Sequence, residues 1–331
     1  MSRATRNSRT RSRSRKFNST RPTIRTTARD FVREAEITGG LEHPGIVPVY
    51  GLGTYADGRP FYAMKFIRGD SLKDAVDRYH TPRRREKPRT AGEKNLQLRR
   101  LLQRFIDVCE AIDYAHSRGV LHRDLKPGNI MLGRHGETLV VDWGLAKSLG
   151  KASEASAASH APSHEDAAED LPLMPEAPLV PQSSSNDASE PTMQGNTLGT
   201  PAFMSPEQAH GRIDLLGPAS DIFSLGATLY VLLTGAVPYR GADTLEVLTK
   251  AQKADYPRPR SIDKSIPRDL EAICVKAMAP AIGDRYKTAK ALADDLEHWL
   301  ADEPVTARSG NVLERLGRLT APASRHSWRR P

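Results

Sequence analysis

Apolar residues recur at helical spacing over most of the chain after residue 95. The pattern predicts four clear helices, at residues 96–118, 221–234, 269–278 and 288–300. The second of these has no polar face, which is typical of a helix buried on all sides, and Asp221 stands where an N-cap residue is expected. The larger, C-terminal part of the chain is therefore predicted to be mainly helical.

Shorter elements are predicted nearer the N-terminus. A helix that begins at Asp30 carries Glu34 and ends by the glycine pair at residues 39–40. Two runs of mostly apolar residues follow it, at 47–53 and 59–67, and both are typical of strands. A small region that contains β-strands is therefore expected to precede the helical part.

A hairpin is predicted in the middle of the chain. Two apolar triplets, at 130–132 and 139–141, flank a turn that contains glycine. Pairing about a centre between residues 135 and 136 would set Asn129 opposite Asp142. The sequence therefore predicts that these two oxygen-bearing side chains lie together at one end of the ribbon.

The composition fits a soluble globular chain that is long enough to bury a substantial core. Of its 331 residues, 38% are hydrophobic and 27% are charged. The longest near-apolar stretch, residues 225–237, is too short to span a bilayer, and no secretory signal is visible. Cys109 and Cys274 fall on apolar helix positions, which indicates buried thiols in a reducing compartment. We therefore expect a cytoplasmic location.

The charge is distributed unevenly. Residues 1–28 contain eight Arg, one Lys and no acid, and Arg29 brings this total to +10, so the net charge of +9 leaves −1 for residues 30–331. With one Phe and one Ile, this basic leader has too little apolar surface to offset the entropy of ordering, and disorder is expected. Residues 1–29 could contact nucleic acid or an anionic membrane surface weakly, but a solvated leader is the favoured interpretation.

Three further segments are predicted to be irregular. Residues 148–196 form an Ala/Ser/Pro-rich insertion, and its central part, 151–190, has a net charge of −7, so disorder is expected there. Residues 78–100 are rich in Arg and Lys and predict a surface insertion, and residues 304–331 predict a basic tail. The acidic insertion could fold over a basic segment and inhibit the protein, although a solvated linker is favoured.

The most informative residues lie between 122 and 144, where the run His-Arg-Asp-Leu-Lys-Pro-Gly-Asn is followed by Asp-Trp-Gly. Asp124 could orient a substrate hydroxyl and accept its proton, and Lys126 would add positive charge beside a transferred phosphoryl group. Asn129 and Asp142 offer the hard oxygen ligands that Mg²⁺ prefers. Each residue alone would be an ordinary turn residue, but the ordered set favours phosphoryl transfer with ATP and Mg²⁺.

These motifs resemble the catalytic core of bacterial members of the eukaryotic-like (Hanks-type) serine/threonine protein kinases. The resemblance extends over about residues 29–303 through short matches at 31–35, 43–47, 199–201, 205–207, 221–226 and 284–286. It implies an α+β, protein-kinase-like fold. The remnant of a small lobe would comprise residues 29–72, and a mainly helical large lobe would comprise residues 73–303.

The resemblance also implies roles at the nucleotide and acceptor sites. Met64 would lie behind the adenine, Met131 beneath its ring and Asp70 near the ribose, while Glu34 would pair with a lysine that contacts the phosphates. Thr200 would help to shape the acceptor site for serine and threonine.

Regulatory roles are implied for the segment between the metal ligand Asp142 and the acceptor site. Arg123 would anchor a phosphorylated residue there, and Thr192 and Thr197 are the candidates, with Thr192 preferred. Trp143 replaces the commoner Phe and is expected to pack beneath the helix that carries Glu34.

Three residues are expected to support the large lobe. By the resemblance, Glu207 would pair with Arg285, and Asp221 would hold the backbone of the catalytic loop in addition to its predicted place at the start of a helix. No structural metal site is predicted, because His116 and His122 have no partners at metal-site spacing.

Two features of the family are missing from the sequence. No glycine-rich strand and turn precede Glu34, no Val-Ala-x-Lys strand follows them, and residues 1–28 contain no glycine. Lys16 lies at a plausible interval before Glu34, but the charged run before it predicts no buried strand, so Lys16 is not favoured as the missing lysine. We therefore interpret the small lobe as truncated.

Two functions remain open at this point. The first is a serine/threonine protein kinase that transfers the γ-phosphate of ATP to hydroxyl groups of protein substrates, and the intact set Asp124, Lys126, Asn129 and Asp142 favours it. The second is a catalytically impaired pseudokinase that acts as a docking or regulatory module, and the missing lysine favours that alternative.

Overall fold

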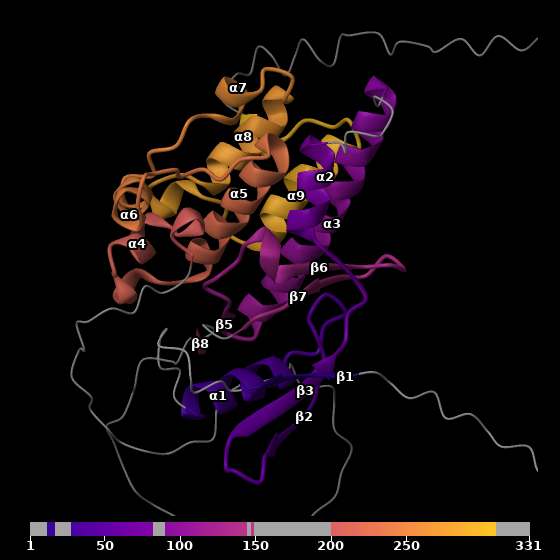
Figure 1. Ribbon diagram of the computed structural model, residues 1–331. Helices are drawn as coiled ribbons and strands as arrows, with labels where there is room; N and C mark the ends of the chain where they lie inside the picture. The colour runs from indigo at the N-terminus through magenta and orange to yellow at the C-terminus, as the bar shows by residue number, and fades with distance from the viewer. Residues whose placement is uncertain (1–11, 17–27, 82–89, 144–146, 149–199, 309–331) are drawn as a thin grey trace, which may run out of the picture.

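The computed structural model describes residues 12–16, 28–81, 90–143, 147–148 and 200–308. Figure 1 shows a small part built from α1 and the strands β1 to β3, and a larger part that contains α2 to α9. The predicted division into a small β-containing lobe and a mainly helical lobe is therefore confirmed.

The small lobe is one helix packed against an antiparallel sheet. Helix α1, Ala28–Gly39, contacts β2, Val49–Thr54, and β3, Pro60–Lys65, and the strand order is β1-β3-β2. Ala35 of α1 and Tyr62 of β3 form a small apolar cluster between the helix and the sheet. The helix begins at Ala28, two residues before Asp30, so the prediction that Asp30 starts it was wrong.

The basic leader contributes a strand that the sequence did not predict. Strand β1, Ser12–Lys16, pairs antiparallel with β3, from Ser12 opposite Lys65 to Lys16 opposite Phe61. Without β1, strand β3 would present a free edge, and such an edge binds any extended backbone through main-chain hydrogen bonds, whatever its side chains. The expectation of disorder was therefore wrong for these five residues, and the rest of the leader lies outside the described residues.

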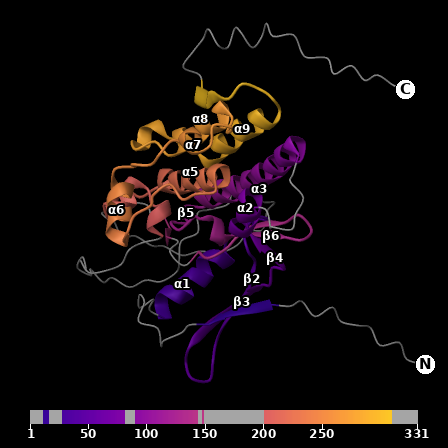
Figure 2. The same ribbon diagram turned by 45° about the horizontal axis from the view of Figure 1, so that its top comes forward.

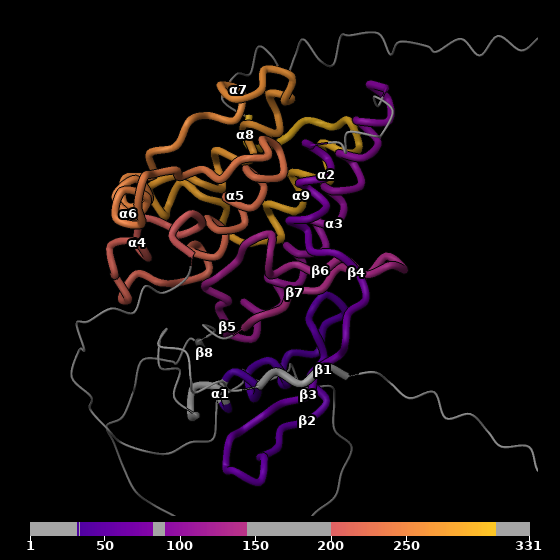
Figure 3. Tube along the Cα trace, viewed as in Figure 1, coloured from indigo at the N-terminus to yellow at the C-terminus, as the bar shows by residue number. Residues whose placement is uncertain are grey.

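A second small sheet leads from the small lobe into the large one (Figure 3). Strand β4, Gly69–Ser71, pairs with β6, Ile130–Gly133, which pairs in turn with β7, Thr138–Val140. Gly69 is needed there, because a Cβ atom at this position would lie 1.8 Å from the carbonyl oxygen of Leu132.

The predicted hairpin is present, but its register differs by one residue from the prediction. Ile130 pairs with Val140 and Leu132 with Thr138, so the hairpin is centred on His135, and Asn129 faces Val141 instead of Asp142. The cause is a loop with an odd number of residues, in which Gly136 takes a φ of 102° that favours glycine. Asp142 follows one residue later, at the same end of the ribbon.

Two capped helices open the large lobe. Helix α2, Leu72–His80, starts at Ser71, and the long helix α3, Ala91–Ser117, starts at Thr90, each through a capping box. The interpretation of residues 78–100 as a surface insertion was therefore wrong at both ends, because Thr90 and Glu93 form a capping box that begins the helix five residues before Leu96.

The core of the large lobe surrounds α5, Pro218–Thr234, whose residues from Ser220 to Leu233 are all buried. Helix α3 packs against α5 and α9, Ala289–Leu300, and α5 packs against α8, Arg268–Ala277 (Figure 2). Gly226 permits this close approach, since a Cβ atom there would lie 2.7 Å from Cγ of Met278. Cys109 and Cys274 are both buried, as predicted.

The packed lobe extends beyond the predicted boundary at residue 303. Val305 is buried, and Thr306 donates its backbone N–H to the buried carboxylate of Asp295 at 2.6 Å. A buried carboxylate needs donors, so this segment is held in place as the 3-10 helix η5, Thr306–Arg308. Residues 309–331 of the predicted tail lie outside the described residues.

The remaining elements are short, apart from one further helix of the large lobe. They are β5 at Val120–Leu121, η1 at Pro127–Asn129, β8 at Lys147–Ser148, η2 at Pro201–Phe203, α4 at Pro206–Ala209, η3 at Ile213–Leu215, α6 at Thr244–Gln252, α7 at Pro259–Ile262 and η4 at Ile282–Asp284. Among the helices that the structure describes, none is both long and apolar enough to cross a membrane.

Candidate active site

The predicted phosphoryl-transfer residues meet in the loop between β5 and β6. The Nζ atom of Lys126 lies 2.5 Å from Oδ2 of Asp124 and 2.7 Å from Oγ1 of Thr200. Thr200 also donates its backbone N–H to Oδ1 of Asp124 at 2.9 Å, and its hydroxyl lies 3.1 Å from the same atom. The carboxylate of Asp124 and the ammonium group of Lys126 therefore form one cluster with the hydroxyl of Thr200, which is distant from both in the sequence.

Asn129 is oriented as a metal ligand would require. Its Nδ2 atom lies 2.8 Å from the carbonyl oxygen of Asp124, and because a carbonyl can only accept, the amide nitrogen must face it. The Oδ1 atom of Asn129 forms no hydrogen bond within the part of the chain that the structure describes, and it remains available as a hard ligand. The side chain is buried, with 6% of its surface exposed, so its orientation is fixed by packing.

Asp142 follows the hairpin strand β7 with a left-handed backbone, at a φ of 69°. Such a φ is uncommon for a residue other than glycine and is found where a side chain must point in a particular direction. The backbone bond from the Val141 N–H to the carbonyl oxygen of Asn129, at 2.9 Å, joins the two predicted ligand segments. The pair of oxygen donors fits Mg²⁺ in type.

The backbone of the catalytic loop is held by one buried carboxylate. Asp221 accepts the backbone N–H groups of His122 at 2.9 Å and Arg123 at 2.8 Å, and Nε2 of His116 lies 2.8 Å from its Oδ2 atom. Burial by itself raises the pKa of Asp221, but the hydrogen bonds that its carboxylate accepts from His116 and from the backbone of Arg123 hold this pKa below its usual value. Arg123 has a φ of 69°, a strained backbone that these bonds support.

The position of Asp221 corrects one prediction. Helix α5 begins at Pro218, after Gly217, so Asp221 lies in the first turn and is not the N-cap. Proline is favoured at the first helical position, and this signal in the sequence marks the start better than the aspartate does.

His122 lies between the loop and the Asp142 segment. Its ring centroid is 4.7 Å from that of Trp143, and its Nε2 atom lies 3.3 Å from the carbonyl oxygen of Val141. Burial lowers the pKa of His122 below the ordinary value, so the ring is neutral at neutral pH. Trp143 is buried in the same apolar cluster as Ile37 of α1.

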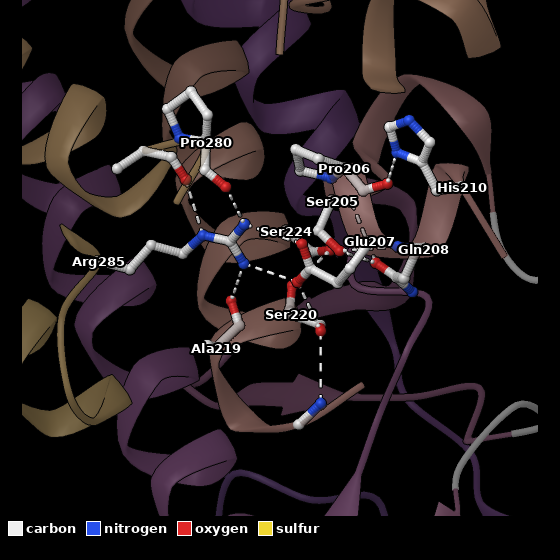
Figure 4. Close-up of polar contacts among 12 residues, drawn as sticks. Ser205, Pro206, Glu207, Gln208, His210, Ala219, Ser220, Ser224, Pro280 and Arg285 are labelled. Carbon is white, nitrogen blue, oxygen red and sulfur yellow. Dashed lines mark hydrogen bonds and ion pairs between the residues drawn. The ribbon is translucent and has the colours of Figure 1, made fainter. Parts of the chain in front are cut away.

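Figure 4 shows the contacts of Glu207 and Arg285. The two side chains form a bidentate ion pair, with Nη1 to Oε1 at 2.7 Å and Nη2 to Oε2 at 2.9 Å. Arg285 also donates to the carbonyl oxygens of Ala219 and Pro280, and Ser220 donates to Glu207. The arginine and glutamate side chains are only 0% and 4% exposed, so this pair joins α4 to the loop after α8 inside the lobe.

Gln208 is a residue that the sequence reasoning missed. Its Nε2 atom donates to the carbonyl oxygen of Arg123 at 3.0 Å, and its side chain also caps α4 through Ser205. The spacing Ser-x-x-Gln is a capping-box signal, which could have found it. The helix that carries Glu207 is thereby bonded to the catalytic loop.

Glu34 lies in the small lobe on α1 and is buried. Its Oε1 atom accepts a hydrogen bond from the hydroxyl of Tyr62 at 2.7 Å, which ties the helix to β3. Tyr62 had no motif to single it out, since it occupies an ordinary buried position of a strand.

The other predicted nucleotide residues lie on the strands that connect the lobes. Met64 is on β3, where it is half-buried against the cluster formed by Ala35 and Tyr62. Met131 is on β6, and its Cα partner is Ser71 of β4. Asp70 is on β4 and forms an ion pair with Arg78 at 2.9 Å, and both side chains are exposed. Thr192 and Thr197 lie outside the described residues.

Comparison with known proteins agrees with this arrangement. The family model of the protein kinase domain matches residues 2–165, a span that includes β1. The serine/threonine-protein kinase PknD of Protochlamydia amoebophila is 32% identical over 272 residues, which cover 82% of this chain and 25% of that protein. PknD of Chlamydia pneumoniae is 33% identical over 280 residues, which cover 83% of this chain and 27% of that protein. PknD of Chlamydia trachomatis serovar D is 34% identical over 285 residues, which again cover 83% of this chain and 27% of that protein.

The chain spans about a quarter of the length of these curated relatives. The region that the family model matches nevertheless includes Asp124, Lys126, Asn129 and Asp142. The chain therefore belongs to the Hanks-type family of bacterial serine/threonine protein kinases.

Proposed function

We propose that this chain transfers the γ-phosphate of ATP to serine and threonine hydroxyl groups of protein substrates. The observation that supports this most strongly is the cluster of Asp124, Lys126 and Thr200, in which a carboxylate and an ammonium group lie 2.5 Å apart. A structural ion pair would need no hydroxyl shared between the two charges, nor an asparagine oriented beside them.

The two oxygens of Asp124 have different neighbours. Oδ2 faces Lys126, while Oδ1 accepts the N–H of Thr200, so the carboxylate is fixed in one orientation. In the proposed reaction Asp124 orients the acceptor hydroxyl and takes its proton as the phosphoryl group arrives. Lys126 then stabilises the negative charge on the transferred group, and Thr200 keeps its ammonium in position.

Asn129 and Asp142 would hold Mg²⁺ through the oxygens described above. When bound, the ion neutralises charge on the ATP phosphates and polarises them. Met64 and Met131 would border the adenine and Asp70 the ribose, while Glu34 would position the cation that contacts the phosphates. Asp70 would have to share its carboxylate with Arg78.

Arg123 is the proposed anchor for a phosphorylated residue, Thr192 by preference or Thr197. Its carbonyl oxygen is held by Gln208 and its N–H by Asp221, so its backbone is fixed on both sides. A phosphate bound to the guanidinium of Arg123 would therefore be linked through this fixed backbone to the catalytic loop.

The test is Mg²⁺-dependent transfer of labelled γ-phosphate from ATP to the chain itself and to a basic carrier protein. Asp124→Asn and Asp142→Ala should each abolish transfer, while Asp214→Asn, a change in an exposed ion pair, should leave it unchanged. Absence of transfer by the folded wild-type chain would contradict the proposal and leave a docking module as the function.

A further inference from the structure

The large lobe contains a concave site that the proposed reaction does not use. A cavity of about 640 Å³ lies between α7, α8 and η5. In Figure 1, α7 and α8 lie at the end of the molecule away from α1 and β1. Six of the lining residues are ionisable: Arg258, Arg260, Arg268, Lys276, Arg308 and Glu271.

Most of the positive charge around this cavity has no carboxylate beside it. Arg308 pairs with Asp269 at 2.9 Å, whereas Arg260 donates to the neutral carbonyl oxygen of Ile266 at 2.6 Å. Lys276 donates to a hydroxyl, that of Thr306, at 3.2 Å. Of the five cations that line the cavity, one therefore has a carboxylate partner among the described residues.

Two of the arginines are available to a ligand. Arg258 and Arg268 are exposed, and their guanidinium groups form no hydrogen bond or ion pair with any residue that the structure describes. The one lining carboxylate, Glu271, accepts the backbone N–H of Arg260 at 2.9 Å. The cavity thus has a surplus of positive charge. Cations that line one cavity repel each other, and a bound anion would reduce this repulsion.

Exposed arginines are usually solvated, but the walls distinguish this cluster from a scattered one. Ala272, Val275 and Ala279 line the same cavity, so part of its wall is apolar. Low-dielectric walls strengthen the field of the charges above them, which favours capture of an anion.

We infer that this cavity binds a phosphorylated serine or threonine residue of a protein segment. Guanidinium groups match the oxygens of a phosphate in a bidentate fashion, and the near-dianionic charge of phosphoserine or phosphothreonine suits several unpaired cations better than a single carboxylate does. The volume also leaves room for residues that flank the phosphate. The choice of phosphate over other anions rests on the proposed function, because a serine/threonine kinase produces this group.

The test is fluorescence anisotropy with the full chain and three labelled peptides, in the absence of ATP. The peptides contain phosphothreonine, threonine or glutamate at one position between uncharged flanks. We expect the phosphothreonine peptide to bind about tenfold or more tightly than the threonine peptide, and Arg258→Ala and Arg268→Ala each to weaken it about fivefold.

Lys264→Ala is the matched control, since Lys264 is an exposed cation on the same lobe that does not line the cavity. It should change the affinity less than about twofold. Because neither guanidinium group has a partner among the described residues, the Arg258→Ala and Arg268→Ala variants should have the same thermal unfolding midpoint as the wild type.

Equal binding of the phosphothreonine and threonine peptides would overturn the inference, and so would phosphopeptide binding that survives the double change Arg258→Ala and Arg268→Ala. If the glutamate peptide bound as tightly as the phosphothreonine peptide, the inference of a phosphate site would be wrong, and the ligand would be an acidic segment in general. The same measurements are made with the Asp124→Asn variant. This variant should still bind the phosphothreonine peptide, so failure of the binding inference can be distinguished from failure of the proposed reaction.

Discussion

The Oδ2 atom of Asp221 lies 2.9 Å from the backbone nitrogen of His122, although ninety-nine residues separate the two in the sequence. The same carboxylate accepts the next N–H along the chain, that of Arg123. The most buried helix of the large lobe thereby fixes the backbone immediately before Asp124. Stability of the lobe and geometry of the proposed active site depend on one side chain.

Asp221→Asn should therefore reduce both properties. An amide can accept with one atom only, so at least one buried N–H loses its partner, and we expect a loss of about 3 kcal/mol in the free energy of unfolding. Phosphate transfer should fall about tenfold or more because the loop is no longer held. Urea unfolding and the transfer assay measure the two effects, and a variant as stable and active as the wild type would contradict the assignment.

The pair Glu207 and Arg285 gives a prediction about coupling. Arg285→Met leaves a buried carboxylate without its guanidinium and should cost about 3 to 5 kcal/mol. Glu207→Met should cost a similar amount, but the double variant should lose much less than the sum, since neither charge is then left unpaired. A double-mutant cycle in urea measures this coupling, and strictly additive losses would show that the two side chains act independently.

Acid should destabilise the folded chain from about pH 6.5 downwards through His122. Burial holds the pKa of this ring below 6.5 in the folded chain, while in the unfolded chain it has the ordinary value. Between the two pKa values the unfolded chain binds more protons, so the free energy of unfolding falls as the pH falls. Asp221, whose pKa is below its ordinary 3.8, adds its loss only at more acidic pH.

Urea midpoints at several pH values between 5 and 8 would reveal this dependence. His122→Gln should flatten the slope around pH 6, whereas the slope should persist in His298→Gln, a change at a side chain that is 44% exposed. A slope that is the same in His122→Gln as in the wild type would assign the pH dependence to another group.

The sequence was a good guide where one local pattern determines the structure. The helices around Leu102, Ile273 and Leu292 were predicted because each buries a face at helical spacing, and all three residues are buried. Asp124 and Lys126 were proposed as site residues for a similar reason, since phosphoryl transfer requires particular groups in a particular order, and the structure places both beside Thr200.

Other features depend on partners that a local pattern does not contain. Strand β1 exists because β3 offers an edge to pair with, and nothing in the residues Ser12–Lys16 indicates that edge. The register of the hairpin depends on the backbone angle of Gly136, and the link from Gln208 to Arg123 depends on how α4 packs. Such contacts are set by tertiary structure and are beyond the reach of periodicity.

The hydroxyl of Thr200 should increase the rate of transfer but contribute little to stability. Its hydroxyl bridges Lys126 at 2.7 Å and Asp124 at 3.1 Å, and valine has the same shape without the hydroxyl. We expect Thr200→Val to lower the transfer rate about tenfold and to change the free energy of unfolding by about 1 kcal/mol or less. Thr200→Ser keeps the hydroxyl and should retain most of the activity, so equal losses in the two variants would contradict a role for the hydroxyl.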